Sequence, residues 1–177
     1  MGRYVVKSEE VLYAASPLVA VTAADIAELK ARAARSKRRR CRICLHADPG
    51  DALHDMVIVH AGGTYDRPHM HPHKAETLTV LEGSAVLLLF ADDGRLTGAV
   101  TMGIAGQAAR APMVRVPPRQ YHALLIESDW LVMGESTLGP FDAEATRPAA
   151  WSPSGGDEAE TARYVAALTA DTAAFRS

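Results

Sequence analysis

Short apolar runs separated by turn residues fill the chain between residues 42 and 137, and no other feature limits the possible folds as strongly. The runs that we predict as strands cover residues 42–46, 55–60, 64–71, 76–81, 85–90, 96–102, 113–117, 121–126 and 130–137. Turn residues mark several boundaries, as at Gly62-Gly63 and Pro117-Pro118. Many short strands with such turns are typical of an all-β sandwich or barrel.

One of these strands, residues 85–90, has apolar side chains on both faces. Such a strand lies in the middle of a sheet and is covered on both sides. A second subunit could supply the outer cover, so we expect the protein to be a homodimer.

Helical patterns flank the β region. Thr22 and Asp25 predict an N-cap, and residues 23–37 carry an apolar stripe; a weaker stripe predicts a second helix from Glu158 to about Ala173. A chain of 177 residues is long enough for one domain with its own core. We expect three parts: an N-terminal strand and helix extension packed on the barrel (1–41), the barrel (42–140) and a C-terminal extension (141–177).

The first predicted helix runs into a basic cluster, residues 37–40. We interpret this cluster as a solvated last turn, because positive charge suits the negative end of a helix dipole. The alternative is a contact to a phosphate or carboxylate group.

The overall composition is ordinary, and the formal net charge of -2 gives no indication of a nucleic-acid partner. No apolar run approaches the roughly 20 residues of a membrane span, and no leader pattern is visible. We therefore expect a cytoplasmic protein with no membrane partner. Two cysteines, Cys41 and Cys44, form a lone CxxC, but in a strand they would point to opposite faces, so we interpret them as ordinary reduced thiols.

Two histidines and a glutamate have a spacing that β-structure can gather around one metal ion. His69 and His71 lie two residues apart, so in a strand they project to the same face. If residues 72–75 form a hairpin loop, Glu76 pairs with His71 and its carboxylate joins that face.

A third imidazole lies far downstream, at His122. If Ser128-Asp129 form a two-residue turn, His122 pairs with Glu135 on an inward-facing side. Three imidazoles and the carboxylate of Glu76 suit one divalent ion, and a six-coordinate geometry leaves two positions for water or substrate. Fe(II), Mn(II), Ni(II) and Zn(II) are all chemically plausible.

The spacing Gly63-(five)-His69-x-His71-(four)-Glu76-(six)-Gly83 matches the first motif of the cupin superfamily at every position. The second cupin motif is usually built on Pro-x-Gly-x-x-His, and residues 117–122 match its Pro and His while Arg119 stands in place of the Gly. The chain thus resembles the cupins. This resemblance implies a double-stranded β-helix (jelly-roll barrel), here with an N-terminal helix and a C-terminal tail or helix, and supports His69, His71, Glu76 and His122 as metal ligands.

The whole chain also resembles the WbuC-type cupins, metalloproteins often found with O-antigen and other surface-polysaccharide genes. Asp55 and Gly134 depart from that family's pattern, which often has Glu and His there. The segments that carry the resemblance are Arg42-Ile43-Cys44-Leu45-His46, Leu53-His54-Asp55-Met56, Tyr65 to His71, Lys74-Ala75-Glu76, Ser128-Asp129, Gly139-Pro140-Phe141-Asp142 and Trp151-Ser152-Pro153. We expect Phe141 and Trp151 to pin the C-terminal segment over the barrel.

Further candidate residues surround the ligands. Tyr65 and Arg67 share the parity of His69 and His71, so we expect them to line the cavity, Tyr65 as a weak acid and Arg67 as a fork for an anion. Glu135 is either bonded to a ligand histidine or a general base. The remaining candidates for substrate binding are Lys74, His46, Arg119 and Tyr121, and His46 is equally well explained as a polar residue at a strand edge.

Three functions fit this pattern. The leading hypothesis is a metalloenzyme that acts on a small polar or anionic substrate; the resemblance implies a carbohydrate-type substrate, with isomerase or lyase chemistry. The second is a non-haem Fe(II) dioxygenase. The third is a non-catalytic module in which the ion anchors a ligand.

Overall fold

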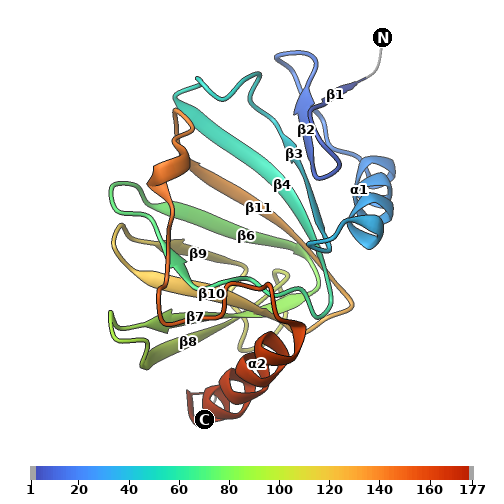
Figure 1. Ribbon diagram of the computed structural model, residues 1–177. Helices are drawn as coiled ribbons and strands as arrows, with labels where there is room; N and C mark the ends of the chain where they lie inside the picture. Colours follow the sequence, from blue (N-terminus) through green and yellow to red (C-terminus); the bar gives the residue numbers. More distant parts are fainter. Residues whose placement is uncertain (1–2, 176–177) are drawn as a thin grey trace.

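Two β-sheets face each other in the computed structural model, which describes residues 3–175 (Figure 1). Within these residues the larger sheet has seven strands, in the order β1 (Tyr4–Val6), β2 (Val11–Ala14), β3 (Arg40–Cys44), β4 (Leu53–Ala61), β11 (Trp130–Leu138), β6 (Glu76–Glu82) and β9 (Met113–Val116). The smaller sheet has five, in the order β12 (Arg147–Pro148), β5 (His69–Met70), β10 (Tyr121–Ile126), β7 (Ser84–Phe90) and β8 (Leu96–Gly103). This arrangement confirms the predicted all-β jelly-roll barrel of the cupin type. Residues 1–2 and 176–177 of the expected extensions lie outside the described residues.

The first helix, α1 (Ala23–Arg35), packs against the outside of β3 and β4. It begins with a capping box, in which the Asp25 N–H donates to the Thr22 hydroxyl and the Thr22 N–H donates to the Asp25 carboxylate at 2.7 Å. Its buried face, Leu29 and Ala33, meets an apolar cluster that includes Ile43. The predicted helix is confirmed.

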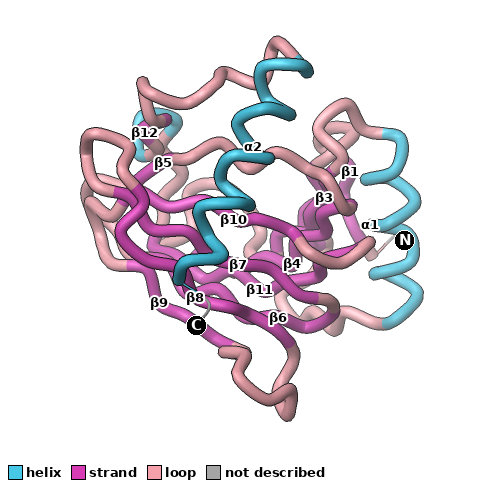
Figure 2. Tube along the Cα trace, turned by 90° about the horizontal axis from the view of Figure 1, so that it is seen from below, coloured by secondary structure: helices cyan, strands magenta, loops and turns pink. Residues whose placement is uncertain are grey.

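The second long helix, α2 (Glu158–Thr172), crosses the outer face of the smaller sheet over β7 and β10 (Figures 1 and 2). Two 3₁₀ turns, η1 (Ala143–Ala145) and η2 (Ala173–Phe175), lie on either side of it in the chain. Among the helices of residues 3–175, none has both the length and the apolar character needed to cross a membrane.

β7 is covered on both faces, as the sequence predicts. Leu87 belongs to the core between the sheets, whereas Val86 and Leu88 pack in a cluster with Leu168 of α2. The outer cover is therefore a helix of the same chain, so β7 gives no separate indication of a partner subunit.

The two cysteines lie on opposite sides of β3. Cys41 packs beneath α1, while Cys44 belongs to the core between the sheets. Both are free thiols, and burial raises the pKa of Cys41 to about 11, so it is protonated and unreactive. The prediction of ordinary reduced thiols agrees with this placement.

Two predicted pairings and one predicted strand are wrong. β5 covers only His69–Met70 and pairs with β10 and β12, while Glu76 starts β6 in the other sheet, so His71 and Glu76 are not hairpin partners. β10 and β11 also belong to different sheets, which excludes the pairing of His122 with Glu135. The predicted pairings assume that consecutive strands lie side by side in one sheet, as in a meander. In a jelly roll, consecutive strands often belong to the two opposite sheets. Residues 64–68 form no strand.

Candidate metal centre

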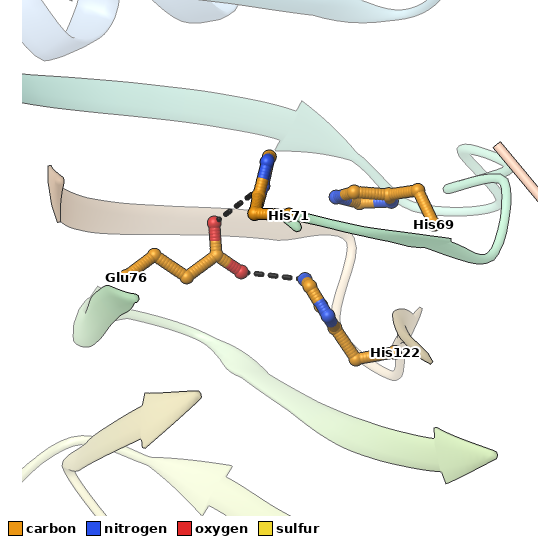
Figure 3. Close-up of side chains that lie close together, drawn as sticks. All are labelled: His69, His71, Glu76 and His122. Atoms are coloured by element: carbon orange, nitrogen blue, oxygen red, sulfur yellow. Dashed lines mark ion pairs between the residues drawn. The ribbon is translucent and has the colours of Figure 1, made fainter. Parts of the chain in front are cut away.

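Four side chains converge between the sheets: His69, His71, Glu76 and His122 (Figure 3). One potential ligand atom from each lies within 4.8 Å of the others. Nε2 of His71 is 3.1 Å from Oε2 of Glu76, and Nε2 of His122 is 2.5 Å from Oε1. The histidines come from β5, the residue just after it, and β10 in the smaller sheet, whereas Glu76 comes from the larger sheet, so the cluster bridges the barrel.

Backbone carbonyl groups fix the orientation of all three imidazoles. The Nδ1 atoms of His69, His71 and His122 bond to the carbonyl oxygens of Arg67 (2.8 Å), Ala145 (3.0 Å) and Gln120 (2.9 Å), respectively. A carbonyl oxygen only accepts, so each Nδ1 must carry the hydrogen. In each neutral ring Nε2 is then the atom with a free lone pair, as a metal ligand requires.

The donor set fits a divalent ion. Nε2 of His122 is buried and makes no hydrogen bond, although the Glu76 carboxylate is only 2.5 Å away. A lone pair and a carboxylate oxygen at that separation repel each other unless a proton or a cation lies between them. Burial acts to raise the pKa of Glu76, but protons on Nε2 of His122 and His71, at the place a cation would otherwise take, outweigh burial and hold the pKa well below its usual range. With protons or with a cation there, the carboxylate is ionised. Three nitrogens and one carboxylate suit Fe, Mn, Ni or Zn.

The cluster lines a cavity of about 1040 Å³. Glu135 of β11 lines the same cavity, on the inward side that the sequence predicts, although by a different strand pairing. Burial, with a smaller contribution from the charge of Glu76, raises the pKa of Glu135 to about 7. This carboxyl group can therefore exist in either protonation state near neutral pH.

Tyr65 and Arg67 also line the cavity, but both hold the C-terminal segment. The Tyr65 hydroxyl donates to the Pro153 carbonyl at 3.0 Å. The Arg67 guanidinium donates to the Ala149 carbonyl at 2.9 Å and to the Ser152 hydroxyl at 3.3 Å. The sequence predicts that both side chains face a substrate. In the structure, some of their hydrogen-bond donors are instead bonded to the C-terminal segment.

Three of the proposed substrate-binding residues lie away from the cavity lining. The Lys74 ammonium is 3.4 Å from the Leu138 carbonyl. Tyr121 packs edge-on against Trp151, at 5.8 Å between ring centroids. His46 stacks on His54, with ring centroids 4.0 Å apart. Each has a structural partner, and the structure does not bring these three to the ligands.

Arg119 also lies outside the cavity, and its side chain is exposed. Its φ of 65° is the left-handed conformation that the usual glycine of the second cupin motif would adopt easily. Its backbone N–H donates to the His71 carbonyl at 2.8 Å. The turn therefore keeps its geometry although arginine replaces glycine.

The aromatic residues expected to pin the C-terminal segment behave differently. Trp151 packs against Phe90, with ring centroids 5.1 Å apart, as predicted. Phe141 is 58% exposed, so for this residue the prediction is wrong.

Two polar residues that line the cavity, Arg42 and His60, were not among the sequence candidates, and Arg40 was considered only as part of the basic cluster 37–40. His60 is buried on β4, its Nδ1 has no hydrogen-bond partner, and burial lowers its pKa to about 4. A signal for the arginines existed, because Arg40 and Arg42 have the strand parity of Cys44 and therefore face the barrel. From the sequence alone, Arg40 is predicted to lie in the turn after the helix, so the alternation of Arg40, Arg42 and Cys44 is not apparent there.

A family model described as a domain of unknown function (DUF6016) matches residues 21–102, which is less than half of the chain. No curated protein matches the sequence.

Among solved structures, the chain is similar to protein SO0799 from Shewanella oneidensis, with 15% identity and a TM-score of 0.47 over 59% of this chain and 66% of that one. It is also similar to the capsular polysaccharide assembling protein CapF from Staphylococcus aureus (19% identity, TM-score 0.45, 56% of this chain and 26% of CapF). A third is oxalate decarboxylase from Bacillus subtilis (16% identity, TM-score 0.46, 62% of this chain and 27% of the decarboxylase), so the chain spans less than two thirds of each of these proteins.

Proposed function

We propose that this protein is a metalloenzyme that holds one divalent ion through His69, His71, Glu76 and His122 and acts on a small polar or anionic substrate of the carbohydrate type. The observation that carries the proposal is the common orientation of the three imidazoles, each with Nδ1 committed to a backbone carbonyl. Histidines that only fill space need no shared tautomer. Here the shared tautomer leaves three Nε2 lone pairs beside one buried carboxylate.

The chemistry of the cavity favours proton transfer. A divalent ion bound there would polarise a carbonyl or hydroxyl oxygen of the substrate. Glu135, with its pKa of about 7, would take up or release a proton at neutral pH. The Tyr65 hydroxyl would be a weaker second acid only after its bond to the Pro153 carbonyl opens. These groups support isomerase or lyase chemistry. The sequence resemblance to the WbuC-type cupins supports a surface-polysaccharide context.

The first experiment is metal analysis of the purified protein and of matched histidine variants. We expect stoichiometric metal in the wild type, and little in His122→Ala. The control is His73→Ala, which changes an exposed histidine in the loop between His71 and Glu76 and should keep its metal. Equal metal content in both variants would refute the site.

A second experiment separates the three functions. Glu135→Gln should keep the ion and lose turnover of sugar-derived substrates under anaerobic conditions. Oxygen consumption that depends on bound iron would instead identify a dioxygenase. No turnover by the wild type under any metal, together with unchanged ligand affinity in Glu135→Gln, would identify a binding module.

A further inference from the structure

Two arginines of β3 point into the cavity that contains the candidate metal centre. Arg40 and Arg42 both line it. The side chains between and after them, Cys41 and Ile43, pack in the apolar cluster beneath α1, so the arginines occupy the opposite, inward face of the strand. A β-strand that turns arginines toward a barrel interior removes part of their hydration, which costs free energy unless something compensates the charge.

The described residues supply no direct ion pair for these charges. Within residues 3–175, no carboxylate oxygen lies within 4.0 Å of the Arg40 or Arg42 guanidinium. Nε of Arg42 is buried and has no hydrogen-bond partner. Burial and the nearby charge of Arg38 lower the pKa of Arg40, although the carboxylates of Asp66 and Glu10 act to raise it. Arg38 itself lines the cavity but is paired, with Nε 2.7 Å from Oε2 of Glu10.

The whole cavity shows the same surplus of positive charge. In the described part of the chain, six basic residues line it, namely Lys37, Arg38, Arg39, Arg40, Arg42 and Arg67, of which Arg38 is paired with Glu10 outside the lining. Four acidic residues do so, namely Asp66, Glu76, Glu135 and Glu158. Glu76 belongs to the candidate metal centre. A ligand with more than one negative charge suits this balance, and a phosphate ester carries about -1.5 to -2 at pH 7.

The arginines lie at a distance from the metal centre. The sheet order β3-β4-β11-β6 separates β3 from the strand that carries Glu76 by three strand spacings, about 14 Å across the sheet. The pairing row of Arg42 meets β6 at Val80, which lies four residues, or about 13 Å along the strand, from Glu76. One molecule could therefore place an anionic group on β3 and a hydroxyl or carbonyl group at the ion.

We propose that Arg40 and Arg42 form a phosphate subsite, so that the substrate is a phosphorylated compound whose hydroxyl- or carbonyl-bearing part reaches the metal centre. The planar guanidinium groups match phosphate oxygens in a two-point geometry. The inference about the substrate rests on the proposed function, whereas the anion subsite itself does not require the ion.

The test is titration calorimetry with inorganic pyrophosphate, on the protein as purified and after removal of metal by a chelator. We expect metal-free wild type and Arg38→Gln to bind pyrophosphate with similar affinity. Arg40→Gln and Arg42→Gln should each weaken binding by about tenfold or more, because each loses charge-assisted hydrogen bonds. Thermal unfolding of every variant shows whether it is folded, and if Arg42→Gln does not fold, the result for Arg40→Gln decides.

Unchanged affinity in Arg40→Gln, or no binding of pyrophosphate to the wild type, would overturn the subsite. Malonate is the comparison probe, and tighter binding of malonate than of pyrophosphate would overturn the assignment to phosphate. A wild type that takes up no divalent metal when it is supplied, and yet binds pyrophosphate through Arg40, would refute the proposed metalloenzyme and leave the subsite standing. The two proposals can thus fail separately.

Discussion

The metal centre and the arginine face of β3 line one cavity but hold their polar groups in different ways. At the metal centre, each histidine has its second nitrogen bonded to a backbone carbonyl, so the rings are oriented before any ligand arrives. On β3, Arg40 and Arg42 have long side chains and no ion-pair partner among residues 3–175. The first arrangement selects a ligand by geometry, the second by charge. We therefore expect added salt to weaken anion binding strongly and metal binding little.

The largest effect should come from Glu76→Gln, which should weaken binding at the metal centre and leave binding at the arginines unchanged. The substitution keeps the size of the side chain but removes the charge that faces His71 and His122. Loss of a residue that only supports a ligand lowers metal affinity by about 10- to 100-fold. Because Glu76 would bind the ion directly, we expect its replacement to lower metal affinity by more than about 100-fold. Metal titration measures this loss. Pyrophosphate binding to the metal-free protein should persist, and its loss would show that the two regions are not independent.

A buried histidine beside the arginines makes stability depend on pH. The pKa of His60 is lowered by burial to about 4, below the value of about 6.5 for an unfolded chain. Between these values only the unfolded chain binds the proton, so stability is intact above about pH 6.5 and falls as the pH drops toward 4. The loss from this one group is about 3 kcal/mol.

Urea unfolding of metal-free protein at about pH 7 and about pH 4 measures this contribution. His60→Leu should reduce the difference between the two free energies of unfolding, whereas His73→Leu, at an exposed position, should not. Equal acid sensitivity of wild type and His60→Leu would show that this ring is protonated in the folded state.

A smaller effect is expected from Arg67→Gln, which acts on the metal centre through the C-terminal segment. Arg67 holds the carbonyl of Ala149, and the same segment supplies the Ala145 carbonyl that orients His71. We expect metal affinity to fall by about tenfold, as for the loss of a supporting contact. Limited proteolysis near residues 146–156 should become faster, and added metal should slow it. Unchanged metal affinity with faster cleavage would show that the segment does not govern the orientation of His71.

The smallest effect should come from Arg119→Gly. A left-handed conformation costs a non-glycine residue about 1 to 2 kcal/mol, but glycine also gains freedom in the unfolded chain. We expect the free energy of unfolding to rise by less than about 1 kcal/mol, with metal content unchanged. Chemical denaturation measures the change, and a clear loss of stability would mean that the exposed arginine side chain makes a stabilising contact.

The sequence predicts correctly that the four candidate ligands converge, but through pairings that the fold does not contain. Parity within a strand and the cupin spacing both point to His69, His71, Glu76 and His122, which do converge. The assumed hairpins are wrong because local spacing cannot distinguish a turn within one sheet from a crossing between two. The apolar strands, by contrast, were predictable, since their periodicity depends only on near neighbours.

The polar walls of the cavity were harder to predict. In the sequence, Arg40 is the last residue of a basic cluster. Only its pairing with His60, which joins β3 to β4, shows that it belongs to the sheet. Tyr65 and Arg67 have the expected location, but their partners come from residues 149–153, far along the chain. No short-range pattern in the sequence indicates where such a distant segment returns.

The bond between Nδ1 of His71 and the carbonyl of Ala145 joins residues 74 positions apart. During synthesis the four ligands leave the ribosome before Ala145 does, so a growing chain that has folded its barrel strands still lacks one of the groups that orient the centre. Contacts of such long sequence separation form late in folding. If the centre holds an ion as proposed, we therefore expect the ion to be acquired after the segment that carries Ala145 has docked.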